Sequence, residues 1–256
     1  MENISILRSL ISHEMRQQWK SKFLQTVFIF AIFIIYSSLL LSALTYETEG
    51  RLLMDFGLGF IEIIAVASVV FGISSAILKD IETKTIYLIL SRPVSRWVYL
   101  TGKYIGIVSS VIVSMLLMAG ILCGLLLIKK VPIDSTFAQI LIASALKITI
   151  VGALTLLVSL ISTSVLSCVV IVGIFYTLGH FMAEIQFISG KINIFASILT
   201  KPIQYIIPNM VIFNLNDILN ADKSLFAGWF NLMGYTLVYS AMCVVFAIVL
   251  FRKKEF

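Results

Sequence analysis

The stretch YIGIVSSVIVSMLLMAGILCGLLLI, residues 104–128, is 25 residues long and contains no Asp, Glu, Lys or Arg. At about 1.5 Å per residue, a helix of this length crosses the roughly 30 Å hydrocarbon core of a bilayer. A helix also satisfies its own backbone hydrogen bonds, which lipid cannot do. The stretch therefore predicts a membrane-spanning helix and, with it, an all-α integral membrane protein.

The composition of the whole chain agrees with a lipid-embedded fold. Mean hydropathy is +1.05, 60% of the 256 residues are hydrophobic and only 12% are charged. A soluble domain carries about 25% charged residues, so this much apolar surface requires a membrane as solvent. The net charge of +6 does not gather on one soluble face, which argues against nucleic acid as a partner. The three cysteines lie inside apolar runs and show neither disulfide nor metal spacing.

Further apolar runs predict five more spans. The run 148–183 has 36 residues without Asp, Glu, Lys or Arg, about 54 Å as one helix, so it must turn, best at residues 162–164. The run 202–216 is too short for a span and contains two prolines, which suits a re-entrant or interfacial segment. We expect one transmembrane domain over residues 1–256, with spans at about 24–44, 57–78, 104–128, 138–161, 165–187 and 228–251.

The distribution of positive charge predicts the topology. With six spans, twelve of the nineteen Lys and Arg residues lie in the N-terminal segment, in residues 79–103 and at the C-terminus, all on one side. The positive-inside rule places that side, and both termini, in the cytoplasm. The expected location is therefore the cytoplasmic (inner) membrane, with membrane lipid as a partner.

The segment 1–22 has the pattern of an amphipathic helix that lies on the membrane surface. Apolar residues recur at steps of three and four, and the opposite face is polar and basic. Such a helix rests its apolar face in lipid and turns its cations toward headgroups. The alternative is a soluble extension of the first span. The apolar positions are Ile4, Leu7, Ile11, Met15 and Trp19.

Four ionisable residues fall inside predicted spans and are candidates for a transport pathway. Glu62 and Lys147 both lie in the outer halves of their spans, so depth allows a pair, and either residue is placed to line an outer cavity. Alternatively, the Lys147 side chain extends to the outer membrane–water interface. His180 and Glu184 are four residues apart and are expected on one helical face. Two ligands do not make a metal site, so a hydrogen-bonded or cavity-lining pair is favoured over a metal or a proton relay.

Residues 80–106 form a charged connection between two long apolar runs. Pro93 disfavours helix at the residue before it, and Ser95 is suited to cap a new helix starting near Arg96. The apolar residues 86–90 need a cover, either lipid or a docking partner. Glycines elsewhere are expected to mark close helix packing, at positions Gly102, Gly106, Gly120, Gly124, Gly152 and Gly173.

Two motifs carry a resemblance to a known family. The first is Glu82-x-x-Thr85-Ile86, Leu90-Ser91-Arg92-Pro93-Val94-Ser95-Arg96 and Tyr99-Leu100-x-Gly102-Lys103-Tyr104; the second is Ile207-Pro208-Asn209-Met210 with Phe213-Asn214. Together with the six-span layout they resemble, over essentially the whole chain, the permease subunits of type-2 ATP-binding-cassette transporters. The resemblance is narrower to the branch of multi-copper-enzyme-maturation permeases. Lys84 stands where that family commonly has glycine.

The resemblance implies that the loop between spans two and three is a coupling helix that docks in a groove of a separate ATPase. It assigns this role to Glu82, Thr85, Ile86, Leu88 and Leu90. Arg92 and Arg96 either brace the turn against acidic groups or phosphates, or reflect ordinary positive-inside topology. Pro208 and Asn209 would belong to an outer re-entrant gate, with a lipid-surface loop as the alternative.

No motif for ATP hydrolysis is present in this sequence. A P-loop requires G-x-x-x-x-G-K-[ST], but Trp97 stands five residues before Gly102-Lys103 and Tyr104 follows the lysine. We therefore expect no enzyme activity and no cofactor in this chain, with ATP and magnesium in the partner ATPase. The resemblance implies an exporter with a second permease chain, as homodimer or heterodimer. A stand-alone channel or scaffold, or an intramembrane enzyme without a recognisable motif, is the alternative.

Overall fold

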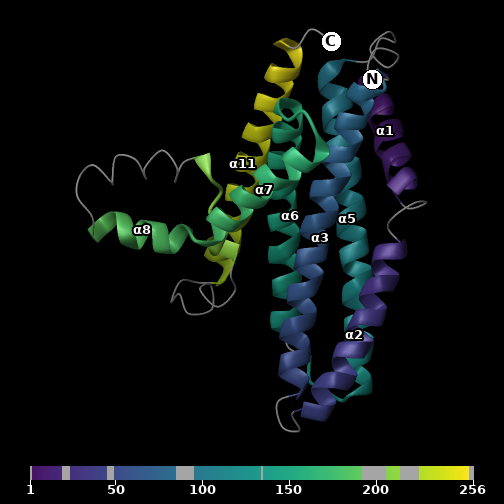
Figure 1. The fold of residues 1–256 in the computed structure, drawn as a ribbon, viewed down its shortest axis with the longest axis vertical. Coiled ribbons are helices and arrows are strands. Elements are labelled where there is room, and N and C mark those ends of the chain that lie inside the picture. Colours follow the sequence, from purple (N-terminus) through teal and green to yellow (C-terminus); the bar gives the residue numbers. More distant parts are fainter. Residues whose placement is uncertain are drawn as a thin grey trace.

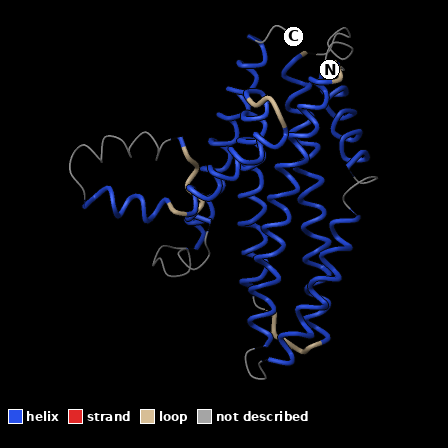
Figure 2. Tube along the Cα trace, viewed as in Figure 1, coloured by secondary structure: helices blue, strands red, loops and turns tan. Residues whose placement is uncertain are grey.

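The computed structural model describes residues 2–18, 24–44, 49–84, 95–133, 135–191, 206–213 and 225–253. Within these residues the regular structure is helical and no strand occurs (Figure 2), which confirms the all-α prediction. The elements are α1 (Glu2–Gln18), α2 (Leu24–Leu44), α3 (Glu49–Glu82), α5 (Arg96–Ile128), α6 (Ser135–Ile161), α7 (Val165–His180), α8 (Met182–Lys191), the 3-10 helix η2 (Val211–Phe213) and α11 (Leu225–Lys253).

Three long helices, α3, α5 and α6, form the centre of the bundle (Figure 1). Helix α1 packs chiefly on α5, α2 on α3 and α5, and α11 on α6, while α7 contacts α3 and α6. Helix α8 extends sideways from the bundle. The beginning of α1 and the end of α11 lie at the same end of the molecule, which we call the terminal end. The end of α3 and the start of α5 lie at this end as well.

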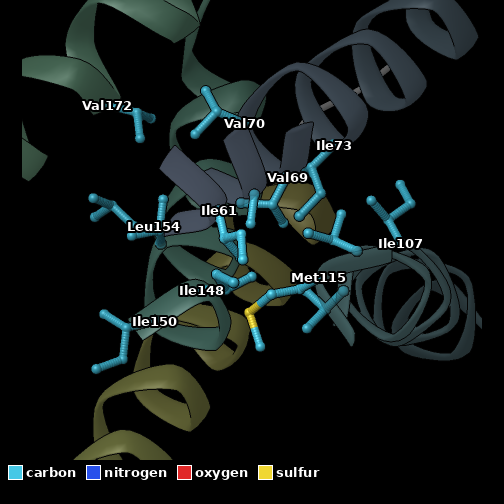
Figure 3. Close-up of a cluster of buried hydrophobic side chains, with 14 of the residues drawn as sticks. Ile61, Val69, Val70, Ile73, Ile107, Met115, Ile148, Ile150, Leu154 and Val172 are labelled. Carbon is cyan, nitrogen blue, oxygen red and sulfur yellow. The ribbon is translucent and has the colours of Figure 1, made fainter. Parts of the chain in front are cut away.

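The core lies where α3, α5 and α6 meet, and Figure 3 shows the side chains that fill it. Helices in lipid gain little from hydrophobic burial against each other, so close van der Waals packing must hold them together. Gly152 on α6 illustrates this packing, because an added Cβ atom would lie 2.9 Å from Val108 Cγ2 and 3.2 Å from Val69 Cγ2. Ile61, Ile73, Ile107, Met115 and Ile148 are each at most 1% exposed.

Several helices have the length and surface of membrane spans. Four stretches are long and apolar enough to cross a bilayer: Leu52–Glu82, Arg96–Ile128, Ser135–Ile161 and Gly228–Lys253. Two shorter apolar helices are Gln25–Leu40 and Val165–His180. Large apolar side chains on α2, α7 and α11 face outward, among them Phe28, Leu166 and Leu237, each about two-thirds exposed. These features make the chain a multi-pass membrane protein.

Two helix boundaries lie where they were predicted. Helix α6 ends at Ile161 and α7 begins at Val165, with the Ser164 hydroxyl accepting from the Ser167 N–H at 3.2 Å as an N-cap. Helix α5 begins at Arg96, as expected. Ser95 holds the N-cap position in an extended backbone conformation, but its hydroxyl has no hydrogen-bond partner among the described residues.

The predicted fifth span, 165–187, is not one continuous helix. Helix α7 ends at His180, Phe181 forms a turn, and α8 starts at Met182. The Met210 N–H donates to the Gly179 carbonyl at 3.1 Å. In a continuing helix that carbonyl would accept from the N–H of Ala183, four residues later. A segment distant in sequence therefore replaces the helical hydrogen bond at the break.

The apolar face of the N-terminal helix, which was predicted to rest in lipid, has a protein partner. The face of α1 that carries Leu10 and Ile11 packs on α5, where Gly102 and Gly106 leave room for it. A Cβ atom at Gly106 would lie 2.8 Å from Glu14 Cβ and 3.3 Å from the Ile11 carbonyl oxygen. The apolar face of α1 therefore contacts protein, and α1 runs alongside α5 (Figure 1). The side chains of Ile4 and Trp19 are outside the described set.

Candidate functional site

A cluster of polar side chains joins α3, α6 and α7 inside the bundle. We call it the Glu62 cluster; it consists of Glu62, Ser144, Lys147, Tyr176 and His180. Lys147 Nζ lies 2.6 Å from Glu62 Oε1, and the Tyr176 hydroxyl donates to the same oxygen at 3.0 Å. The Ser144 hydroxyl donates to Glu62 Oε2 at 3.1 Å. The carboxylate is thus held by three donors from two neighbouring helices.

The spacing of these residues along their helices explains the cluster. Ser144 and Lys147 are three apart on α6, and Tyr176 and His180 are four apart on α7, so each pair shares a helix face. The Lys147 side chain is only 3% exposed. A buried ammonium needs an anion and hydrogen-bond acceptors, because desolvation costs several kcal/mol. Glu62 supplies the anion, so Lys147 does not extend to the interface.

His180 adds a second neighbour to the Lys147 ammonium. Its Nε2 lies 3.4 Å from Lys147 Nζ, and its Nδ1 lies 3.0 Å from the Tyr176 carbonyl oxygen. The ammonium donates and the carbonyl accepts, so these two contacts fit the tautomer protonated at Nδ1. The imidazole then acts as an acceptor for Lys147 within the cluster.

Glu184 does not join His180, contrary to the expectation of one shared helical face. The turn at Phe181 separates the two residues, and the Glu184 side chain is exposed on α8. His180 instead faces a cation, which is an unfavourable neighbour for a metal ion. Across the described part of the chain, no group of three or more His, Cys, Asp or Glu residues is placed to hold a metal.

The segment that contains Pro208 and Asn209 is a non-helical stretch buried between α7 and α11. The Asn209 N–H donates to the Tyr235 hydroxyl at 2.9 Å, and the Tyr239 hydroxyl donates to the Ile206 carbonyl at 2.8 Å. Met210 is fully buried. Irregular backbone at membrane depth is tolerated where protein covers it or water fills the site. Here protein from both helices supplies the contacts.

Gly179 allows this segment to approach α7. A Cβ atom added there would lie 2.6 Å from the Pro208 carbonyl oxygen, a backbone atom that cannot move aside alone. We expect Gly179→Ala to lower the free energy of unfolding by about 1–3 kcal/mol, as overpacking does. The matched control is Gly173→Ala on the same helix, where nothing lies within 4 Å of the added atom. It should be neutral or gain up to about 1 kcal/mol from helix propensity.

Denaturant unfolding of both purified variants in the same detergent measures the difference. A Gly179→Ala variant as stable as the Gly173→Ala variant would contradict the close approach of the two segments.

A second polar cluster lies at the terminal end. We call it the Lys103 cluster; it consists of Glu14, Asp80, Tyr99 and Lys103, from α1, α3 and α5. Lys103 Nζ forms an ion pair with Asp80 and lies 3.7 Å from Glu14 Oε1. The Tyr99 hydroxyl donates to Asp80 Oδ2 at 2.5 Å, and Lys103 also donates to the Ala76 carbonyl at 3.0 Å. The cluster therefore ties three helices together beside the α3–α5 connection.

Arg96 connects the start of α5 to the end of α11. Its Nη1 donates to the carbonyl oxygens of Phe251 and Arg252, each at 3.2 Å. The last carbonyls of a helix have no intrahelical partner and carry partial negative charge, so a guanidinium is well placed there. The ring of Tyr99 stacks on Phe251 with centroids 6.1 Å apart. Arg96 thus braces a helix end in place of the expected acidic group or phosphate.

The predicted coupling residues lie only partly within the described chain. Glu82 is the last residue of α3 and is exposed. Lys84 follows with φ of 55°, the left-handed conformation that glycine adopts most readily. This explains in physical terms why glycine would suit the position. The remaining coupling residues lie outside the described residues: Thr85, Ile86, Leu88, Leu90 and Arg92.

The helices, their outward apolar surfaces and the polar clusters between them define a multi-pass helical membrane protein. Residues 8–256 match the family described as ABC-2 family transporter protein, and the chain belongs to that family. A comparison with curated proteins finds no match. Membership implies a membrane permease whose partner is an ATP-binding-cassette ATPase.

Proposed function

We propose that this chain is the transmembrane subunit of an ATP-binding-cassette exporter that is driven by a separate ATPase docked on residues 80–106. In this proposal the chain crosses the cytoplasmic membrane six times, with α2 and α7 as the two shorter spans. The terminal end, where both termini lie, faces the cytoplasm because the positive charges gather there. ATP and magnesium bind to the partner, and this chain supplies the path for the substrate.

The observation that carries the proposal is the bracing of both helices that flank the docking loop. Asp80, two residues before the end of α3, is joined to Lys103 and Tyr99 on α5. Glu14 adds α1 to this assembly, and Arg96 adds the end of α11. A force on the loop therefore acts on four helices at once. Such a connection is what a permease needs to convert closure of its ATPases into movement of its spans.

The segment around Pro208 and Asn209 is the proposed outer gate. It contacts Gly179, one residue before His180 of the Glu62 cluster. The gate, the end of α7 and the buried ion pair thus form one continuous set of contacts. In this proposal Glu62, Lys147 and His180 hold the gate closed, and Glu184 lies outside the set.

The remaining details of the assembly follow from the resemblance in sequence. The motif around Leu90 to Arg96 favours the multi-copper-enzyme-maturation branch of permeases and outward transport. A second permease chain, identical or different, would complete the path. The outward apolar faces of α2, α7 and α11 provide surface for that chain and for lipid.

Co-purification tests the docking role directly. The chain is tagged, co-expressed with a soluble ATP-binding-cassette ATPase from the same genome, and purified in detergent. Wild type should recover the ATPase in near-equal amount, and the double variant Glu82→Ala/Leu88→Asp should recover roughly tenfold less, the change that about 1.4 kcal/mol produces. The matched control is Asp55→Ala/Phe56→Asp, which likewise removes one carboxylate and puts aspartate in place of a large apolar side chain, at exposed positions of α3 near its other end.

Two results would overturn the docking role. One is a folded wild-type chain that recovers no ATPase with or without nucleotide, which would favour a stand-alone channel or scaffold. The other is an equal loss of ATPase in the control variant, which would show that the effect is not specific to the loop.

A further inference from the structure

A partly open cavity of about 900 Å³ lies between α1 and α3, beside the start of α5. Its volume is in the range of sites that hold a small molecule or a lipid segment. Neither the family match nor the proposed docking of an ATPase assigns a ligand to this space. It lies next to the Lys103 cluster, and the residues that line it indicate which kind of ligand it can bind.

The polarity of the cavity changes along one face of α3. The lining residues recur at steps of three and four from Ile64 to Asp80, which spans about 24 Å of helix. Ile64, Ala67 and Phe71 give a mainly apolar part toward the middle of the bundle, in which Ser68 adds one hydroxyl on α3. Lys79 and Asp80 give a charged part at the terminal end. A ligand that fills the cavity must therefore be apolar at one end and polar at the other.

The polar part is rich in hydrogen-bond donors. The two carboxylates there, on Glu14 and Asp80, already face the Lys103 ammonium, and Asp80 also accepts from Tyr99. The Lys79 side chain is exposed and lines the same part. On α1 the Ser9 hydroxyl and the His13 imidazole line it as well, and the Gln18 amide lies further along the cavity, beside Gly72. An ammonium with several neutral donors suits a phosphate group.

We propose that this cavity binds a phosphate-bearing membrane lipid, with the phosphate at Lys79 and the first part of an acyl chain along Ile64, Ala67 and Phe71. The order of polarity matches a lipid of the leaflet nearest the terminal end, with its headgroup at that end and its chain toward the bundle centre. Only the identification of that leaflet as the cytoplasmic one rests on the proposed function. The binding itself does not require the ATPase.

Binding of two fluorescent lipids to the purified full chain tests the proposal. The probes are NBD-labelled phosphatidylglycerol and NBD-labelled diacylglycerol with the same acyl chains, followed by fluorescence anisotropy at a fixed detergent concentration. Wild type should bind the phosphatidylglycerol at least tenfold more tightly than the diacylglycerol. Because no ATPase or nucleotide is present, this result is independent of the co-purification described above.

Two variants separate the parts of the site, each with a matched control. Lys79→Gln should weaken phosphatidylglycerol binding about tenfold and leave diacylglycerol binding unchanged, since it removes the phosphate partner alone. Ala67→Trp should weaken the binding of both probes, because it fills the apolar part. The controls Lys253→Gln and Ala241→Trp make the same changes at exposed positions of α11 outside the cavity and should have no effect.

Three outcomes would overturn the proposal. Equal affinity for the two probes would show that phosphate is not recognised. Undiminished binding to a folded Ala67→Trp variant would place the lipid elsewhere on the chain. Displacement of the phosphatidylglycerol probe by millimolar inorganic phosphate would show that the cavity takes the free ion and not a lipid.

Discussion

Replacing Lys147 by methionine is expected to lower the free energy of unfolding by roughly 3–5 kcal/mol, the usual effect of removing one partner of a buried ion pair. The Lys147 ammonium lies 2.6 Å from Glu62 Oε1, and the Lys147 side chain is 3% exposed. Without it, the Glu62 carboxylate keeps only the hydroxyl donors of Ser144 and Tyr176. Methionine has a similar length, so the loss arises from charge more than from packing.

The double variant Glu62→Gln/Lys147→Met distinguishes the effect of an unpaired buried charge from the effect of changed side-chain packing. With both charges removed, the buried carboxylate no longer lacks a cation, and we expect most of the lost stability to return. Denaturant unfolding in one detergent compares the two variants, with Lys253→Met at an exposed site as the control. If the double variant were less stable than the single one, the pair would not be the source of the effect.

The helices could be predicted from the sequence because apolar runs of sufficient length have few alternatives in lipid. The helix boundaries at residues 162–164 and at Arg96 were predicted as well, although only Ser164 makes the expected capping hydrogen bond. The break at Phe181 could not be predicted, since it depends on the Met210 N–H reaching the Gly179 carbonyl. A contact between residues 31 positions apart in the sequence leaves no periodic pattern.

The amphipathic pattern of α1 identified the face that is buried but not what buries it. Lipid and a neighbouring helix select the same apolar residues, so the pattern alone cannot distinguish them. The spacing of Gly102 and Gly106 on α5 was the available sign of a close helix contact. Gly120, Gly124 and Gly173 look equivalent in sequence, yet nothing lies within 4 Å of a Cβ atom placed there.

The polar clusters were only partly predictable. The similar depth of Glu62 and Lys147 in the membrane allowed a contact between them to be predicted. No sequence pattern indicated that Tyr176 and Ser144 would also bind Glu62. The ion pairs of Lys103 were not predicted, because the positive-inside rule already accounts for a cation at the terminal end. The useful sign was its place inside a long helix, where it needs an anion once that helix is buried. The coupling role of residues 85–92 remains a prediction.

Replacing Lys103 by methionine is expected to cost roughly 3–5 kcal/mol of unfolding free energy and to release α1 from the bundle. Its side chain is 7% exposed and serves both Asp80 and Glu14, so its removal leaves two partly buried carboxylates close together without a cation. Like charges in a site of low dielectric repel strongly. Glu14 belongs to α1, the helix that has few other polar ties to the bundle among the described contacts.

Limited trypsin digestion distinguishes release of α1 from a general loss of stability. Arg16 is exposed on α1 but lies in a helix docked on α5, and trypsin needs an unfolded segment around its site. Cleavage at Arg16 should therefore be much faster in Lys103→Met than in wild type or in Lys253→Met. The neutral variant Glu14→Gln/Asp80→Asn/Lys103→Met should restore slow cleavage, because the repulsion is gone while the glycine contacts of α5 remain. Fast cleavage in that variant too would mean that the ion pairs themselves hold α1 in place, and equal, slow cleavage in all variants would show that the Lys103 cluster does not anchor α1.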